Sequence, residues 1–179
     1  MPEPNDITLL SVQKALKPKI EEVIPLLLNG DERDAALSFV AYMRANKMQP
    51  SWTAHNSWSA NYKGKKICTI RLPLAHFPYK HWVICPHISR WNKMISSYDT
   101  YKDEIERDGY EAYVWDNVNI CRSCANCGPG WDITVLGKDF SNICHNIPVW
   151  YKDPTDETIG FVKYILLLIQ KTIAESKMK

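Results

Sequence analysis

The feature that most constrains the fold is a long apolar stretch near the C-terminus of this 179-residue chain. Asp153 and Pro154 predict a helix start there, because aspartate caps helices well and proline suits the first helical position. We expect a closing helix over 153–177 whose apolar surface is so wide that it is buried on several sides. A central core helix explains this pattern, although one flank could instead form a two-fold homodimer interface. The stripe repeats at three- and four-residue spacing through Ile159, Val162, Leu166, Ile169 and Ile173.

The N-terminal part, 7–46, is predicted to be helical. Its first segment, 7–28, is interrupted at Lys17-Pro18, where proline removes a backbone donor and suits a new first turn. Its second segment begins after Asp31, a plausible N-cap, and continues to about Asn46.

From Ser51 onward, aromatic and β-branched residues become frequent, which is typical of strands. We interpret 52–62 and 66–72 as two antiparallel strands joined by the short turn Lys63-Gly64-Lys65. A third strand is predicted over 80–85, before Pro86.

The middle of the chain alternates between element types. A helix is predicted within 89–108, best supported over 100–108, and a fourth strand over 110–118. A short strand over 131–136 and a single helical turn over 139–144 follow the cysteines.

This order of helices, strands, a small insert and a closing helix predicts an α+β fold. We expect a mainly antiparallel sheet of four to five strands with helices packed on one face, N-terminal helices and a long buried C-terminal helix. The length favours a single domain over 1–179, with a sheet core at 51–118 and a cysteine-rich insert at 119–150.

Charge and hydropathy exclude several classes of partner. The 22 basic and 20 acidic residues are well mixed, so no basic stripe for nucleic acid is present. The longest apolar run, Ile165–Ile169, is too short to span a membrane, and the N-terminus lacks the pattern of a signal peptide. We therefore expect a cytoplasmic protein, in which six cysteines indicate metal or redox chemistry more than disulfides.

Four of the six cysteines lie within 24 residues. Cys121, Cys124 and Cys127 are spaced three residues apart before a Gly-Pro-Gly turn, and Cys144 follows after sixteen residues. Thiolates bind soft and borderline metals, and a Cys-x-x-Cys turn brings two sulfur atoms to one ion. The spacing predicts a tetrahedral zinc site with four sulfur ligands.

Other uses of these cysteines stay open. A [4Fe–4S] cluster fits a Cys-x-x-Cys-x-x-Cys run with a distant fourth cysteine, and a ligand set that includes His145 in place of Cys127 is a further alternative. Metal-free thiols or disulfides are also compatible, because cysteine is often simply buried. No His-x-Glu or His-Glu-x-x-His pattern accompanies the run, so we expect a structural rather than a catalytic zinc ion.

Aromatic residues, including seven tryptophans, suggest where a ligand could bind. The segment Trp52–Trp58 combines aromatic rings with short polar side chains, as many small-molecule sites do. A strand with one face in the core explains the same pattern. The predicted ligand-binding residues are Trp52, Asn56, Trp58, Tyr62 and Trp82.

Two segments carry a family resemblance. The run Trp58-Ser-Ala-Asn-Tyr-Lys-Gly-Lys-Lys-Ile-Cys-Thr-Ile-Arg and the run His81-Trp-Val-Ile resemble small uncharacterised bacterial α+β domains of the YdhG/YjbR type, over about 31–108. The cysteine segment with its following helix resembles the C-terminal part of unannotated Firmicutes proteins. The resemblance implies a sheet entered through a Gly-Lys hairpin and supplies no catalytic residue.

Together these features predict a non-catalytic bacterial protein with a zinc-stapled loop and an aromatic cleft for a small molecule or a protein partner. The alternative is an enzyme that uses the cysteine cluster, through an open zinc position or through thiol redox chemistry.

Overall fold

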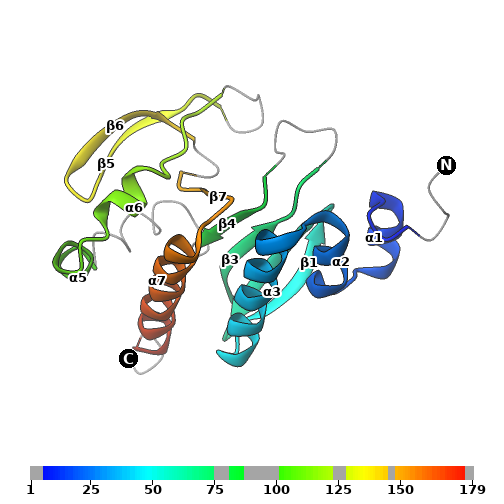
Figure 1. Cartoon of the computed structure of the whole chain (residues 1–179). Helices are drawn as coiled ribbons and strands as arrows, with labels where there is room; N and C mark the ends of the chain where they lie inside the picture. Colours follow the sequence, from blue (N-terminus) through cyan, green and yellow to red (C-terminus); the bar gives the residue numbers. More distant parts are fainter. Residues whose placement is uncertain (1–5, 75–80, 87–100, 123–127, 145–147, 176–179) are drawn as a thin grey trace.

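The computed structural model describes residues 6–74, 81–86, 101–122, 128–144 and 148–175 (Figure 1). Within them the chain has the predicted α+β fold, with a five-stranded antiparallel sheet in the order β1-β2-β3-β4-β7 and a separate two-stranded sheet, β5-β6. The elements are α1 (Leu10–Leu16), α2 (Ile20–Leu27), α3 (Gly30–Ala45), β1 (Gln49–Ala54), β2 (Ser57–Tyr62), β3 (Lys65–Arg71), β4 (Val83–Pro86), α5 (Lys102–Arg107), α6 (Glu111–Trp115), β5 (Trp131–Val135), β6 (Lys138–Ile143), β7 (Tyr151–Lys152) and α7 (Asp156–Glu175).

The N-terminal helices confirm the predicted interruption. Helix α1 ends at Lys17, whose φ of 47° is left-handed, and α2 begins after Pro18. The indole N–H of Trp58, which is completely buried, donates a 2.9 Å hydrogen bond to the carbonyl of Pro18. The break between the two helices is therefore attached directly to the sheet.

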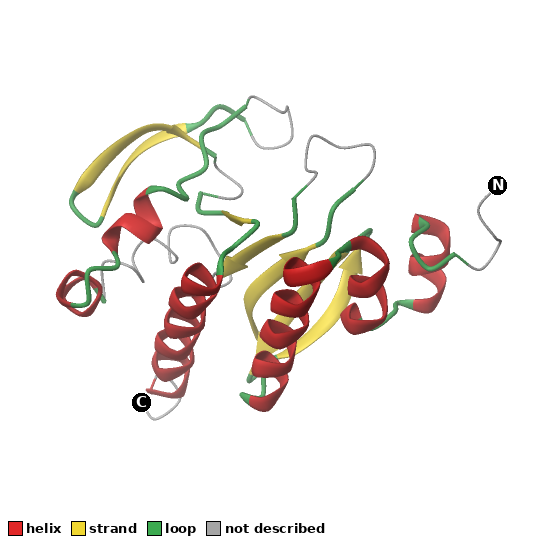
Figure 2. Cartoon of the chain, in the orientation of Figure 1, coloured by secondary structure: helices red, strands yellow, loops and turns green. Residues whose placement is uncertain are grey.

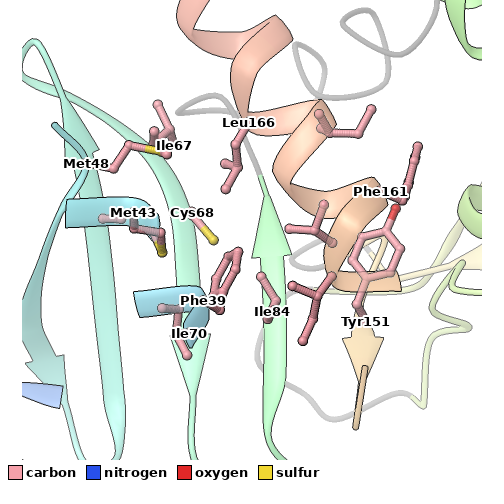
Figure 3. Packing of buried hydrophobic residues seen from close by; sticks show 14 of the residues in the cluster. Phe39, Met43, Met48, Ile67, Cys68, Ile70, Ile84, Tyr151, Phe161 and Leu166 are labelled. Carbon is pink, nitrogen blue, oxygen red and sulfur yellow. The ribbon is translucent and has the colours of Figure 1, made fainter. Parts of the chain in front are cut away.

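Helices α3 and α7 lie side by side over one face of the five-stranded sheet (Figure 2). On that face Trp58 of β2 opposes Ile70 of β3, and Ile70 opposes Ile84 of β4. Phe39 from α3 and Leu166 from α7 reach the same apolar row (Figure 3). We call this the core face of the sheet.

Helix α7 is the core helix that its sequence predicted. Fully burying one such apolar side chain contributes about 1.5–3 kcal/mol, so this helix is a main source of stability. The stripe residues of α7 retain at most 4% exposure: Ile159, Val162, Leu166, Ile169 and Ile173.

None of the helices in the described residues is long and apolar enough to cross a membrane.

The single strand predicted over 52–62 is wrong. The chain turns back between Ala54 and Ser57, so that Trp52 of β1 opposes Trp58 of β2 across an antiparallel pair. Asn56 makes this turn with a φ of 49°, a left-handed conformation that asparagine tolerates better than most residues. The pattern of apolar residues does not reveal the turn, because both tryptophans still reach one face.

The strand predicted over 110–118 is also wrong, since α6 occupies Glu111–Trp115. Tyr110 and Tyr113 pack against Phe161 of α7, with ring centroids 5.2 and 5.5 Å apart. This packing against α7 outweighs the strand preference of aromatic residues.

The helical turn predicted over 139–144 is instead strand β6, which pairs with β5. Leu136 and Gly137, with φ values of 48° and 78°, form the two-residue turn between them. Helix α5 confirms the best-supported part of the helix predicted over 89–108, and residues 89–100 lie outside the described residues.

We expect Asn56→Ala to lower the free energy of unfolding by about 2–4 kcal/mol, because it leaves buried hydrogen-bonding groups unsatisfied and places alanine in a left-handed turn. Urea denaturation measures this change. Asn29→Ala is the control, since the exposed Asn29 side chain makes no capping hydrogen bond. Equal stability of the two variants would contradict the role given to this turn.

Candidate functional site

A buried network of two amide side chains holds the β1–β2 turn. Gln13 of α1 is completely buried, and its Nε2 donates to Asn56 Oδ1 at 2.6 Å. Its Oε1 accepts from the backbone N–H of Asn56 at 2.9 Å and from the indole N–H of Trp52 at 3.1 Å. Asn56 Nδ2 in turn donates to the carbonyl of Pro73 at 2.7 Å. The turn is thus bonded both to α1 and to the end of β3.

A cavity of about 160 Å³ opens beside this turn, where β2, β3 and β4 meet. We call it the sheet-end pocket. Ser57 of β2 opposes Arg71 of β3, and Arg71 opposes Val83 of β4, so all three lie on the sheet face opposite α3 and α7. The polar lining consists of His55, Asn56, Ser57, Arg71 and His81, and the apolar lining of Ala54, Leu72, Leu74, Val83 and Trp150.

Arg71 gives the sheet-end pocket a positive charge. Its guanidinium is half-buried, and it takes part in none of the ion pairs formed by the described residues. The five strands of the main sheet contain the cations Lys65, Lys66, Arg71 and Lys152 and no acidic residue. Burial lowers the pKa of Lys66, and the charge of Arg71 lowers that pKa further.

Ser57 and His81 present further polar groups to the sheet-end pocket. Ser57 is only 6% exposed, and its hydroxyl has no hydrogen-bond partner among the described residues. His81 Nδ1 pairs with the carboxylate of Asp153, which also accepts the backbone N–H of Trp82 at 3.1 Å. This pairing leaves His81 Nε2 available to a ligand.

The predicted ligand-binding residues are dispersed. Asn56 lines the sheet-end pocket, whereas Trp52, Trp58, Tyr62 and Trp82 do not. Trp58 and Trp82 are 0% and 1% exposed and belong to the core. Trp52 and Tyr62 are partly buried and pack against that core.

Sequence reasoning missed Arg71, His81 and Trp150. One signal was available, namely that Arg71 ends a strand within a run of strands that contains no carboxylate to pair with it. Trp150 could not be found in this way, because it reaches the sheet-end pocket from a segment distant in sequence.

Cys68 and Cys85 do not provide reactive thiols. Cys85 opposes Thr69, the residue after Cys68, so the two side chains point to opposite faces of the sheet and cannot form a disulfide. Burial raises the pKa of Cys85 to about 12 and raises the pKa of Cys68 as well. Both therefore stay protonated at neutral pH.

The structure does place Cys121 and Cys144 on neighbouring antiparallel segments. The N–H of Cys121 donates to the carbonyl of Asn142, and the N–H of Cys144 donates to the carbonyl of Asn119, both at 2.7 Å. In this register the two cysteines are diagonal neighbours on one face.

Gly130 brings the chain back to Cys121 after the cysteine run. A Cβ atom at Gly130 would lie 2.7 Å from Cys121 Cβ and would also overlap Asn142. Gly130 and Cys121 therefore lie so close together that only glycine fits at position 130. We call residues 121–130 together with 142–144 the cysteine loop.

The zinc prediction is not decided by these contacts. Cys124 and Cys127, two of the four predicted ligands, lie outside the described residues, as does His145. Among the residues that are described, no three His, Cys, Asp or Glu side chains meet as metal ligands.

No family model, curated protein or solved structure matches this chain. The resemblance to YdhG/YjbR-type domains therefore stays a prediction, and function has to be argued from the geometry of the sheet-end pocket and the cysteine loop.

We expect Gly130→Ala to lower the free energy of unfolding by about 1–3 kcal/mol, because its Cβ forces Cys121 and Asn142 apart. Gly160→Ala is a control of opposite sign. Gly160 is exposed within α7 and has open space around it, so the same substitution should stabilise by about 0.5–1 kcal/mol. Chemical denaturation that shows no loss for Gly130→Ala would contradict the tight closure.

Proposed function

We propose that this chain is a non-catalytic protein that binds a small molecule in the sheet-end pocket and holds a structural zinc ion in its cysteine loop. The observation that carries the binding role is that Arg71 and Ser57 are neighbours in the lining of that pocket, with no ion pair of the Arg71 guanidinium and no hydrogen bond of the Ser57 hydroxyl among the described residues. Both groups face a cavity, so a ligand that accepts their hydrogen bonds can replace the water that otherwise solvates them.

The same groups favour binding over catalysis. Ser57 makes no hydrogen bond to His81 among the described contacts, so no activated nucleophile is formed there. The thiols of Cys68 and Cys85 have raised pKa values and are poor nucleophiles. The alternative is an enzyme that uses the cysteine cluster, through an open zinc position or through thiol redox chemistry.

Zinc fits the donor set of the cysteine loop. Cys121 and Cys144 share one face. Cys124 lies three residues after Cys121, and Cys127 lies three residues before Gly130. Cys121 and Gly130 are themselves close in space. Three residues span about 11 Å at most, so the covalent chain allows four sulfur atoms to converge. Zinc bound by four thiolates would staple segments that have little apolar surface of their own. An iron–sulfur cluster is the lesser alternative for the same cysteines.

The cysteine loop is connected to the sheet-end pocket. Val118 pairs with Val149, and the N–H of Trp150 donates to the carbonyl of Asn117 at 2.8 Å. Trp150 is a wall of the pocket and is only 3% exposed. The segment that leads into the cysteine loop is thus bonded to the segment that presents this indole.

Two further sequence predictions enter this proposal. Cys68 and Cys85 are free thiols, which accords with the predicted cytoplasmic location. A homodimer through a flank of α7 accords with Leu167, whose side chain is 46% exposed, and light scattering measures this oligomeric state directly.

The binding role is tested with a variant that fills the sheet-end pocket. Leu74→Trp places an indole at its wall, and Leu26→Trp makes the same change at an exposed position of α2. In an NMR screen of neutral, anionic and cationic fragments, we expect hits with the parent and with Leu26→Trp, and their loss with Leu74→Trp. Identical hits in both variants, or none with the parent, would refute binding at this pocket.

The zinc role is tested by metal analysis. We expect one zinc ion per chain after aerobic and anaerobic purification, and Cys124→Ser should lose it and lower the melting temperature, since metal binding contributes to folding. Cys85→Ala is the control that keeps the metal, because Cys85 lies on β4 outside the cysteine loop. A brown protein would indicate an iron–sulfur cluster, and unchanged metal content in Cys124→Ser would exclude that ligand.

A further inference from the structure

We propose that the ligand of the sheet-end pocket is a small monocarboxylate with a compact apolar body, bound through Arg71 and Ser57. This inference rests on the proposed binding function and names the class of molecule bound.

The two binding groups are direct neighbours. Ser57 and Arg71 oppose each other across the β2–β3 pair, which places their Cβ atoms about 4.5–5.5 Å apart on one face. The planar guanidinium matches the two oxygen atoms of a carboxylate, and such paired hydrogen bonds are stronger than neutral ones. The Ser57 hydroxyl can donate a further hydrogen bond to one of those oxygens.

The charge balance at the sheet-end pocket favours one negative charge rather than two. Among the described residues of the lining, Arg71 is the only side chain that is always charged. His81 faces the carboxylate of Asp153, so any positive charge on that imidazole is already matched. Asp153 would also repel a second negative charge on the ligand, which argues against phosphate monoesters and inorganic phosphate at neutral pH.

The apolar lining and the volume of the sheet-end pocket favour a ligand with a small apolar part. The apolar part of the lining is supplied by Leu72, Leu74, Val83 and Trp150. A cavity of about 160 Å³ is smaller than typical pockets for drug-sized ligands, which have about 300–1,000 Å³. We therefore expect a short-chain aliphatic carboxylate or a single-ring aromatic carboxylate.

The side chains of Asn56 and His55 are already hydrogen-bonded to other parts of the chain and do not bind Arg71 or Ser57. Asn56 is 4% exposed and fully engaged with Gln13 and Pro73, so it cannot move to pair with Arg71. His55 is likewise engaged, because its Nε2 lies 2.8 Å from the carbonyl of Thr8. Arg71 and Ser57 therefore remain available to a ligand.

The experiment is calorimetric titration of the full chain with butanoate and benzoate, with butanamide and benzamide as uncharged counterparts of the same shape. We expect at least one carboxylate to bind at least tenfold more tightly than its amide. Arg71→Gln should lose at least tenfold in affinity for that carboxylate. Arg107→Gln is the matched control, since Arg107 is exposed on α5 and pairs with Asp108. The affinity of this variant for the carboxylate should equal that of the parent.

Several outcomes would overturn the inference. Equal affinity for a carboxylate and its amide, or unchanged affinity in Arg71→Gln, would show that the carboxylate group is not recognised by Arg71. Tighter binding of inorganic phosphate than of either carboxylate would assign a different anion, and binding of none at millimolar concentration would exclude this ligand class.

These failures are distinguishable from failure of the proposed function. If neutral or cationic fragments bind the parent and are lost in Leu74→Trp, the sheet-end pocket is a binding site and only the ligand class is wrong. If no fragment depends on Leu74, both proposals fail together.

Discussion

Two buried amide side chains, Gln13 and Asn56, connect the N-terminal helix to the first turn of the sheet. The Gln13 amide bonds to both Asn56 and Trp52, and the Asn56 side chain donates to the carbonyl of Pro73, two residues after β3. A buried amide network of this kind contributes specificity, because any other arrangement leaves donors or acceptors without partners. The network holds Asn56 in a left-handed conformation and so determines where β1 ends and β2 begins.

The sheet has two chemically different faces, because successive side chains of a strand point to opposite sides. The core face carries Trp58, Ile70 and Ile84 beneath α3 and α7, and apolar burial there supplies much of the folding free energy (Figure 3). The opposite face carries Ser57 and Arg71, and its strands contain no acidic residue. A cation without an ion-pair partner that lines a cavity marks a candidate binding site for an anion.

The parts of the fold that depend on local pattern could be predicted from the sequence. The stripe of α7, the break at Lys17 and the Lys63-Gly64 hairpin are encoded by residues close in sequence, and the structure confirms all three. The turn at Asn56 could not be predicted, because its partner Gln13 is 43 residues away.

Helix α6 and strand β6 were missed for a similar reason. The aromatic residues around α6 pack against α7, and β6 depends on pairing with β5. The sheet-end pocket also joins distant segments, since Ser57, Arg71, His81 and Trp150 come together only in the folded chain. Of the residues chosen from the aromatic pattern, Asn56 alone lines it, because large rings fill cores as readily as they bind ligands.

The central claim is that the Arg71 guanidinium binds a carboxylate in the sheet-end pocket. It is tested most directly by NMR of the arginine Nε–H groups, with the Arg71 signal assigned from its loss in Arg71→Gln. On titration with a carboxylate that binds in calorimetry, we expect a saturable shift of the Arg71 signal, with the signals of exposed arginines such as Arg107 unchanged. An Arg71 signal that stays in place while that carboxylate binds would show that Arg71 does not bind it.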